Sequence, residues 1–429
     1  MVILGINAYH GDAAAAIVIE GQLVAAAEEE RFNRIKHSAG FPIRAAQYCL
    51  RAAGVTPGEI DVVAIARDPR ARLAQKLLFA ARMPGRALDR LRVQHKFARL
   101  QDDLADALEV DRTELCAPVQ RVEHHTAHLA SAFFVSPFDE AALFSVDGLG
   151  DFASAMWGIG RGNRIAPGGA VVFPHSLGIF YTALTQYLGF PKYGDEYKVM
   201  GLASYGTPEL LDEFRRIVHA SHNGDITFQL GLDYFVHHRQ GIEMTWDGGE
   251  PTISRLYSDH LMQRLGSARQ PEAPVERRHQ NLAASLQQRL EEVLLECLRA
   301  LQRRTGLRRL CLAGGVAFNC VVNGKILADT GFDEVYVQSA AGDAGLAIGA
   351  AMYVWHHRRG KPRGFVMEHS YWGPAFADST VREALRGKRT ALERERCVVK
   401  RIDDEGELCR FAAAHLADGK IVGWFQGRM

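Results

Sequence analysis

The sequence lacks the usual marks of membrane-spanning and disulfide-stapled secreted proteins. No apolar run approaches the roughly 20 residues of a membrane-spanning helix. The opening residues, MVILGINAYHGD, reach a polar turn too early for a signal peptide. The seven cysteines are an odd number, widely spaced and without a CxxC pair. This pattern favours free thiols in the reducing cytoplasm over disulfides or a cysteine-rich zinc site.

The chain also lacks an excess of charge of one sign, with 51 Lys and Arg against 50 Asp and Glu. No overall field therefore attracts nucleic acid or a membrane surface. One segment, 67–99, is locally basic and is either a nucleic-acid patch or a helical insertion with solvated arginines. We favour the insertion, because aromatic side chains for base stacking are nearly absent there.

One strand pattern occurs twice, about 140 residues apart. The first copy consists of VILGI, the turn NAYHGD and a second apolar run with Gly21 at its hairpin turn. AALFSV, the turn DGLGD and a run with Gly160 and Gly162 in its turn form the second. This repetition indicates an internal duplication. It places a turn carboxylate, Asp12 in one copy and Asp147 or Asp151 in the other, at a cleft between two lobes.

The rest of the chain predicts an α/β protein. We expect a helix ending at Gly54, a strand in IDVVAIA, an amphipathic helix over 281–304 and two later strand–turn–helix units. RGKPRG resembles a linker, and the composition changes after it. The sequence therefore predicts two domains, 1–362 and 363–429, and the strand expected in the last residues suggests that the second domain is cut short.

The stretch VEHHTAHLASAFF contains the best candidates for metal ligands. In a helix, His124 and His128 lie on one face, about 6 Å apart, within reach of one ion. Alone, this spacing fits packed core histidines somewhat better than metal ligands. Asp147 and Asp343 each follow a predicted strand, and two histidines with two aspartates suit iron, manganese or zinc better than magnesium.

Glycine pairs suggest a nucleotide site. Gly314 and Gly315, between a strand and a helix, would let a nucleotide approach the backbone, and Asn319 and Asn323 follow on one predicted face. GDAG, which contains Asp343, gives a second such turn. Any α/β turn can use paired glycines, but together with the duplication they resemble the actin-like ATPase plan.

Three further residues are candidates for chemistry. Lysine is scarce, with ten lysines among the 51 basic residues, so Lys36 and Lys198 stand out as groups that could neutralise phosphate. Each could equally be a surface lysine. His10, in the first acidic turn, is either a general base or a turn residue bonded to backbone.

Several long, ungapped stretches resemble the NodU/CmcH family of O-carbamoyltransferases. They are GINAYHGDAAAAIVIEGQLVAAAEEERFNRIKHSAGFP, EHHTAHLASAFF, SVDGLGD, YGDEYKVMGLASYG and LAGGVAFNCVVNGKI with VQSAAGDAGLAIGAA. The resemblance implies an actin-like (ASKHA) duplicated large domain, similar to tRNA threonylcarbamoyl transferases. It also implies that a YrdC-like domain follows, of which 363–429 would be the first part.

The resemblance also implies an activity. The YrdC-like domain would convert carbamoyl phosphate and ATP into carbamoyl adenylate, and the large domain would transfer the carbamoyl group to a hydroxyl of a small molecule such as an antibiotic intermediate or a sugar. The matching positions for a metal, usually iron, are His124, His128, Asp147 and Asp343. A homodimer is compatible with the family, and no nucleic acid or membrane is implied.

The residues and the resemblance together suggest a division of roles. His10 would act as the base, and Lys36 would contact phosphate. Gly314, Gly315, Asn319 and Asn323 would hold the adenosine.

Three alternatives remain open at this stage. Carbamoyl transfer to tRNA rests on the basic segment 67–99. A non-enzymatic actin-like ATP-binding switch needs no metal and leaves the four candidate ligands unexplained. A sugar kinase would use Asp147 as a base and leaves the histidines without a role.

Overall fold

The computed structural model of the chain describes residues 1–82, 99–220, 224–246 and 248–429. These residues divide into two compact units, Met1–Glu368 and His369–Met429. Half of the predicted basic segment, residues 83–98, lies outside the described residues.

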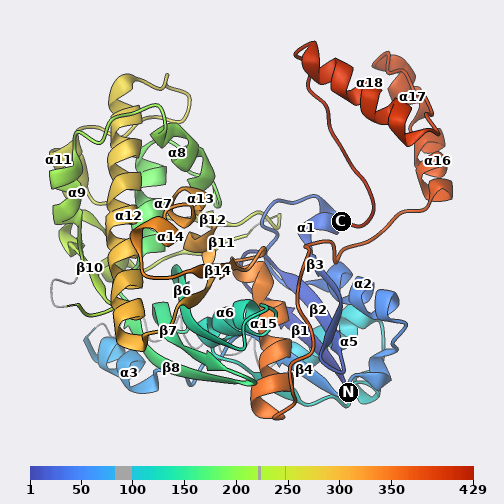
Figure 1. The fold of residues 1–429 in the computed structure, drawn as a ribbon, viewed down its shortest axis with the longest axis horizontal. Coiled ribbons are helices and arrows are strands. Elements are labelled where there is room, and N and C mark those ends of the chain that lie inside the picture. Colours follow the sequence, from blue (N-terminus) through green and yellow to red (C-terminus); the bar gives the residue numbers. More distant parts are fainter. Residues whose placement is uncertain (83–98, 221–223, 247) are drawn as a thin grey trace. The chain divides into compact units, whose positions relative to one another are not determined.

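The larger unit is built on two five-stranded mixed sheets with the same topology (Figure 1). In each, three consecutive antiparallel strands are extended by two parallel strands beside the first of them. The first sheet runs β3 (Gln22–Glu28), β2 (Ala14–Ile19), β1 (Val2–Asn7), β4 (Val62–Ile65), β5 (Val119–Arg121). The second runs β14 (Glu334–Val337), β13 (Arg309–Ala313), β6 (Glu140–Gly150), β7 (Ala153–Arg161), β8 (Arg164–Val172). This repeated order confirms the predicted duplicated, actin-like α/β fold.

The two hairpin turns were predicted with different success. Glu20 and Gly21, both with positive φ, connect β2 to β3 as expected. Gly162, with a φ of 53°, likewise lies between β7 and β8. Gly160 was wrongly expected in that turn, because it lies inside β7. A side chain there would reach within 2.6 Å of the Phe133 ring, so close packing requires this glycine.

Two helices fill the space between the sheets (Figure 1). α6 (His124–Phe133) packs on the second sheet and α15 (Leu346–Tyr353) packs on the first, and the two helices contact each other. All ten residues of α6 are buried. Gly349 permits the close helix contact, because a Cβ there would lie 1.9 Å from the Ala127 carbonyl oxygen. Small residues therefore hold the two histidines of α6 deep in the protein.

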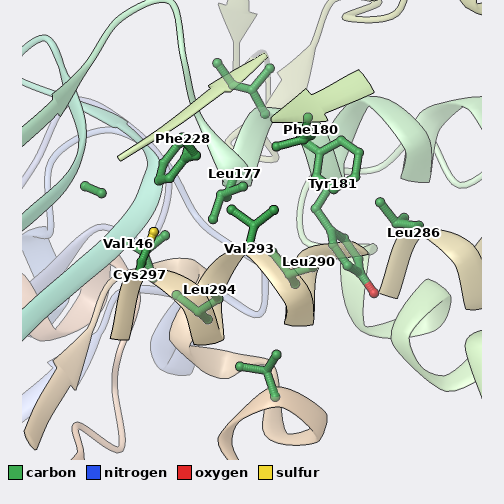
Figure 2. Packing of buried hydrophobic residues seen from close by; sticks show 14 of the residues in the cluster. Val146, Leu177, Phe180, Tyr181, Phe228, Leu286, Leu290, Val293, Leu294 and Cys297 are labelled. Atoms are coloured by element: carbon green, nitrogen blue, oxygen red, sulfur yellow. The ribbon is translucent and has the colours of Figure 1, made fainter. Parts of the chain in front are cut away.

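The long helix α12 (Arg277–Thr305) covers the other face of the second sheet. Figure 2 shows Leu286, Leu290, Val293, Leu294 and Cys297 of this helix packed against side chains of α7 (Leu177–Tyr187) and β6. The sequence predicted this apolar face at helical spacing. The contact fixes the strand whose end carries Asp147.

Smaller elements complete the larger unit. Between the sheets in sequence lie α1 (Glu30–Asn33), α2 (Ile43–Ala53), α3 (Leu73–Arg82) and α5 (Leu100–Leu108). After β8 come α8 (Glu196–Ala203), α9 (Leu211–Ile217), β9 (Val218–Ala220), β10 (Phe228–Leu230), α10 (His237–Gln240), β11 (Met244–Thr245), β12 (Thr252–Ile253) and α11 (Asp259–Leu265). After β13 come α13 (Cys320–Asn323) and α14 (Ile326–Asp329), where one longer helix was expected. None of the described helices combines the length and the apolar character needed to cross a membrane.

The second unit contains three exposed helices, α16 (Asp378–Gly387), α17 (Arg389–Arg394) and α18 (Glu405–Ala417). Ala375 and Arg428 form an isolated β-bridge. The strand expected in GKIVGWF does not form, and Ile421 there is fully exposed. A strand needs a hydrogen-bonded neighbour, and none of the described residues supplies one to this stretch.

Candidate metal centre

The helix that carries the two histidines begins where carboxylates cap it. The Glu123 side chain accepts the Thr126 N–H (2.7 Å), and Asp151 Oδ2 accepts the His124 N–H (3.0 Å). Arg72 in turn pairs with Glu123 at 2.6 Å. Of the two turn carboxylates proposed for the second copy, Asp151 therefore caps α6.

Asp147 and Asp343 lie against the two histidines. His124 Nε2 is 3.1 Å from Asp147 Oδ2 and 3.6 Å from Asp343 Oδ1. His128 Nε2 is 3.6 Å and 3.5 Å from the same two oxygens. The structure thus brings together the four side chains that the sequence analysis grouped, with one atom of each directed at a common point.

These spacings and the unsatisfied atoms fit a bound cation. Ligand atoms about 2.1 Å from an ion lie about 3.0 to 3.4 Å apart in octahedral or tetrahedral sites. His128 Nε2 and Asp343 Oδ1 are buried without a hydrogen-bond partner among the described residues. Buried polar atoms rarely go unsatisfied. The two-nitrogen, two-oxygen donor set suits iron, manganese or zinc.

Each carboxylate uses its second oxygen to hold a neighbour. Asp147 Oδ1 accepts the Gly315 backbone N–H at 2.9 Å. Asp343 Oδ2 lies 3.0 Å from His10 Nδ1. Such outer contacts orient metal ligands. They also place His10, the predicted base, at the edge of the cluster, with its ring centroid 6.4 Å from that of His124.

The electrostatics of the cluster are those of mutually paired groups. Burial lowers the pKa of His128, but the nearby carboxylates of Asp147 and Asp343 outweigh it and raise the pKa to about 9. Burial raises the pKa of Asp147, and His124 and His128 lower it well below its usual value. Without a cation, the carboxylates therefore favour a protonated His128.

The third histidine of α6, His125, does not belong to the cluster. Its Nδ1 lies 2.9 Å from Ser145 Oγ, and the residue is fully buried. Burial, followed by the charge of His124, lowers the pKa of His125 to about 3. His125 is therefore a neutral core residue.

The glycine pair predicted to hold a nucleotide has a packing role as well. A Cβ at Gly314 would lie 2.2 Å from the Val146 carbonyl oxygen, and one at Gly315 would lie 2.8 Å from Asp147 Oδ1. The Gly314 N–H donates to Ala341 O at 2.7 Å. Both backbone donors are thus used within the protein, and Gly315 supports a cluster carboxylate.

The two asparagines face different partners. Asn319 caps α13 by accepting the Val322 N–H at 3.1 Å, and its amide exchanges hydrogen bonds of 2.8 and 3.0 Å with Gln287. Asn323 donates to Ala317 O at 2.7 Å, and its buried Oδ1 has no partner among the described residues. Asn319 precedes its short helix, so the two do not share a helix face as predicted.

The two lysines also lie apart from the cluster's contacts. Lys36 is exposed, with its Nζ 5.9 Å from the centre of the Tyr197 ring. Lys198 pairs with Asp195 at 2.6 Å. Neither bonds to a predicted site residue among the described contacts.

A second histidine–carboxylate group consists of Asp12, Glu30 at the start of α1, and His37. His37 Nδ1 is 2.7 Å from Asp12 Oδ1, and the His37 N–H donates to Glu30 Oε2 at 2.7 Å. The ring of Tyr193 meets His37 edge-on at 5.1 Å. Asp12 was predicted as a turn carboxylate, whereas no role was predicted for His37 and Tyr193, although both lie in stretches that carry the family resemblance.

Residues 208–274, whose side chains we expected from their irregular sequence to form the wall of the acceptor pocket or a packing insertion, are partly core. Tyr234 is buried and donates to Glu213 at 2.9 Å, and fully buried His237 contacts the Pro174 carbonyl at 2.8 Å. The loop between β11 and β12 does reach the first lobe, because the Ala39 N–H donates to Gly249 O at 2.9 Å.

Known proteins resemble the chain over most of its length. The family model described as "Carbamoyltransferase N-terminus" matches residues 2–352. An uncharacterized Synechocystis protein is 38% identical over 100% of the chain and 68% of its own length. Nodulation protein NolNO of Sinorhizobium fredii is 37% identical over 98% of the chain and 56% of its own length. Nodulation protein NolO of Bradyrhizobium diazoefficiens is 37% identical over 72% of the chain and 50% of its own length.

Solved structures give more distant matches. Component A of (R)-2-hydroxyglutaryl-CoA dehydratase from Acidaminococcus fermentans has a TM-score of 0.44 at 12% identity, covering 84% of this chain and 100% of that one. HypF of T. kodakarensis has a TM-score of 0.39 at 13% identity, covering 84% and 48%. The sequence matches confirm the family resemblance that the motifs indicated.

Proposed function

The chain belongs to the carbamoyltransferase family, and from this premise we propose that it transfers a carbamoyl group from carbamoyl adenylate to a hydroxyl of a small-molecule acceptor. The observation that carries the proposal is the cluster of His124, His128, Asp147 and Asp343 with His10 bonded at its edge. It combines a cation site with a base in one place.

The four cluster residues would hold the cation, with iron as the first candidate and manganese or zinc as alternatives. A cation there supplies Lewis acidity toward a carbonyl or phosphate oxygen. Gly315 and His10 keep the two carboxylates oriented from outside.

His10 is suited to take the proton of the acceptor hydroxyl. Its Nδ1 faces Asp343 Oδ2, which favours the tautomer with the proton on Nδ1 and a free lone pair on Nε2. The acceptor oxygen forms a bond to the carbamoyl carbon, the bond from that carbon to the phosphate oxygen breaks, and AMP leaves. The hydroxyl proton passes to His10 Nε2.

The remaining assignments follow the family resemblance. Lys36 would contact phosphate, and Gly314, Gly315, Asn319 and Asn323 would line the adenosine site. The amide of Asn319 would act through its bond with Gln287.

The whole protein would make its own donor. The chain spans about half the length of the two nodulation relatives, and we assign 363–429 to the start of a YrdC-like domain that forms carbamoyl adenylate from carbamoyl phosphate and ATP. Free cysteines throughout agree with a cytoplasmic location.

Carbamoyl transfer to tRNA has less support. Its basis was the basic segment, and in the described part of that segment Arg72 pairs with Glu123 and Arg67 lies 3.8 Å from Asp151. These arginines support the start of α6, as expected of a structural insertion.

The test supplies carbamoyl adenylate to the Fe²⁺-loaded chain and measures AMP release, with water and with a panel of polyhydroxylated acceptors. We expect release above the buffer rate, a carbamoylated product by mass spectrometry, and a loss of about 10² to 10⁴-fold in His10→Ala. Exposed His260 offers a control, and His260→Ala should keep the wild-type rate. No release above buffer, or an unchanged rate in His10→Ala, would contradict the proposal.

A further inference from the structure

The side chain of Tyr193 lies directly on the turn that carries His10. A Cβ at Gly11 would be 3.1 Å from Cζ and 3.2 Å from the hydroxyl oxygen of Tyr193. Gly11, between His10 and Asp12, has no side chain and therefore leaves room for the phenol ring. The phenol borders both the proposed base and the second histidine–carboxylate group.

The Tyr193 ring is held from a second side. It meets His37 edge-on, with centroids 5.1 Å apart and planes at 72°. The next residue, Gly194, fits against the same histidine, because a Cβ there would lie 2.0 Å from His37 Nε2. His37 is fixed in turn by its bonds to Asp12 and Glu30. The orientation of the phenol is therefore set before any substrate binds.

The Tyr193 side chain is partly exposed, and its hydroxyl has no hydrogen-bond partner among the described residues, unlike the hydroxyls of three buried tyrosines. The hydroxyl of Tyr181 donates to Gln287 at 3.0 Å, that of Tyr187 to Leu265 O at 3.0 Å, and that of Tyr234 to Glu213 at 2.9 Å. A positioned phenol without a partner is a donor available to a ligand.

The surroundings keep this donor protonated. Burial raises the pKa of Tyr193 well above its usual value, and the charges of Asp12, Asp343 and Asp147 raise it further. Asp343 and Asp147 belong to the candidate metal centre, and Asp12 belongs to the first turn. The phenol is therefore close enough to both for their charges to act on it.

We propose that the Tyr193 hydroxyl donates a hydrogen bond to the carbonyl oxygen of the carbamoyl group during transfer, an inference that rests on the proposed function. Negative charge develops on that oxygen as the acceptor adds, and a fixed donor stabilises it without reorganisation. Tyr193 keeps its own proton throughout. His10 receives the proton of the acceptor, and AMP carries away the bonding electrons of the broken bond.

The chain supplies a matched control four residues later. Tyr197 is exposed, and its ring lies under the ammonium groups of Lys36 and Lys198 at 5.9 and 5.8 Å. Both Tyr193→Phe and Tyr197→Phe remove one hydroxyl and keep the ring. Each variant is assayed with carbamoyl adenylate as donor and water as acceptor, with kcat, KM, iron content and melting temperature recorded.

We expect Tyr193→Phe to lower kcat by about 10² to 10³-fold with unchanged KM and iron content. Tyr197→Phe should stay within about twofold of wild type. Gly11→Ala, which displaces the ring and leaves the hydroxyl in the chain, should lower kcat by an intermediate factor. A merely structural role would lower the melting temperature or iron content and leave the kcat of the folded fraction intact.

The outcomes separate this inference from the proposed function. If the wild type releases AMP and Tyr193→Phe keeps kcat within about threefold, the donor role is wrong and the carbamoyl transfer stands. If the wild type releases no AMP above buffer, the proposed function and the donor role both fail.

Discussion

The two histidine–carboxylate groups of the larger unit use the same residue types in opposite ways. In the candidate metal centre, nitrogen and oxygen atoms lie 3.1 to 3.6 Å apart around a common point. Two of those atoms, His128 Nε2 and Asp343 Oδ1, are buried without hydrogen bonds. In the second group, the His37 ring bonds to Asp12 and the His37 backbone N–H donates to Glu30, each at 2.7 Å.

The contrast shows what distinguishes a cation site from a polar support. The side chain of His128 is fully buried, whereas that of His37 is 32% exposed. Buried polar atoms are rarely left without a partner, and here two of them face the two carboxylates and the other histidine, an arrangement that a cation would satisfy. A half-exposed group that satisfies itself requires none, and it can instead fix a neighbour such as Tyr193.

Removing one histidine from each group gives the largest expected difference. His128→Ala should reduce the metal content from about one ion per chain to nearly none, because three ligands and a gap remain. His37→Ala should leave the metal content unchanged, because its group already satisfies itself. Elemental analysis of the wild type and both variants checks this. Equal metal loss in both variants, or negligible metal in the wild type, would contradict the assignment of the metal to the first group alone.

A second pair of variants disturbs the histidines without altering them. A Cβ at Gly150 would lie 2.1 Å from the His124 ring, just as one at Gly194 would lie 2.0 Å from His37 Nε2. Gly150→Ala should weaken metal affinity by about 10 to 100-fold, as lost outer support of a ligand does. Gly194→Ala should leave metal affinity intact.

Metal affinity is measured by titration with a competing chelator. Because Gly194 has a φ of 82°, its variant should also lower the melting temperature through backbone strain. A lower metal affinity in Gly194→Ala would mean that the two groups are coupled more tightly than their contacts indicate. An unchanged metal affinity in Gly150→Ala would mean that contact with Gly150 does not position His124.

The smallest expected effect is a pH-dependent change in stability from the second group. Burial lowers the pKa of His37, but its bond and charge interaction with Asp12, and then the charges of Glu30 and Glu196, outweigh burial and raise it. A raised pKa in the folded state stabilises the protein below about pH 6.5. This contribution is lost as the pH rises through the raised value.

Asp12→Asn should therefore lower the melting temperature by about 1 to 3 °C at pH 6, and by less at pH 9. Thermal unfolding at the two pH values measures the difference. Asp333→Asn is the control, because Asp333 pairs with Arg308, and both stay charged across this range. An Asp12→Asn effect that is equal at both pH values would show that His37 is not protonated by its neighbours.

The sequence predicted the fold and the grouping of the cluster from local patterns together with the family resemblance. The four-residue spacing places His124 and His128 on one helix face, and the resemblance implied Asp147 and Asp343 as their partners. The apolar face of α12 was read from the same helical periodicity.

Other features depend on contacts between distant segments. Gly160 was misplaced because its reason is the Phe133 ring of another element. Asn319 bonds to Gln287, 32 residues earlier, and no local sequence pattern predicts this pair. Tyr193 was missed because its position depends on contacts with Gly11 and His37, which are more than 150 residues away in the sequence.

The two segments that begin the sheets have a consequence for how this protein can be engineered. His10 and Asp12 lie between β1 and β2, whereas Asp147 lies within β6, near its end. The two segments belong to separate sheets, so a substitution in one leaves the strand pairing of the other as it is. The first segment can therefore be redesigned while the strand that carries Asp147 is kept.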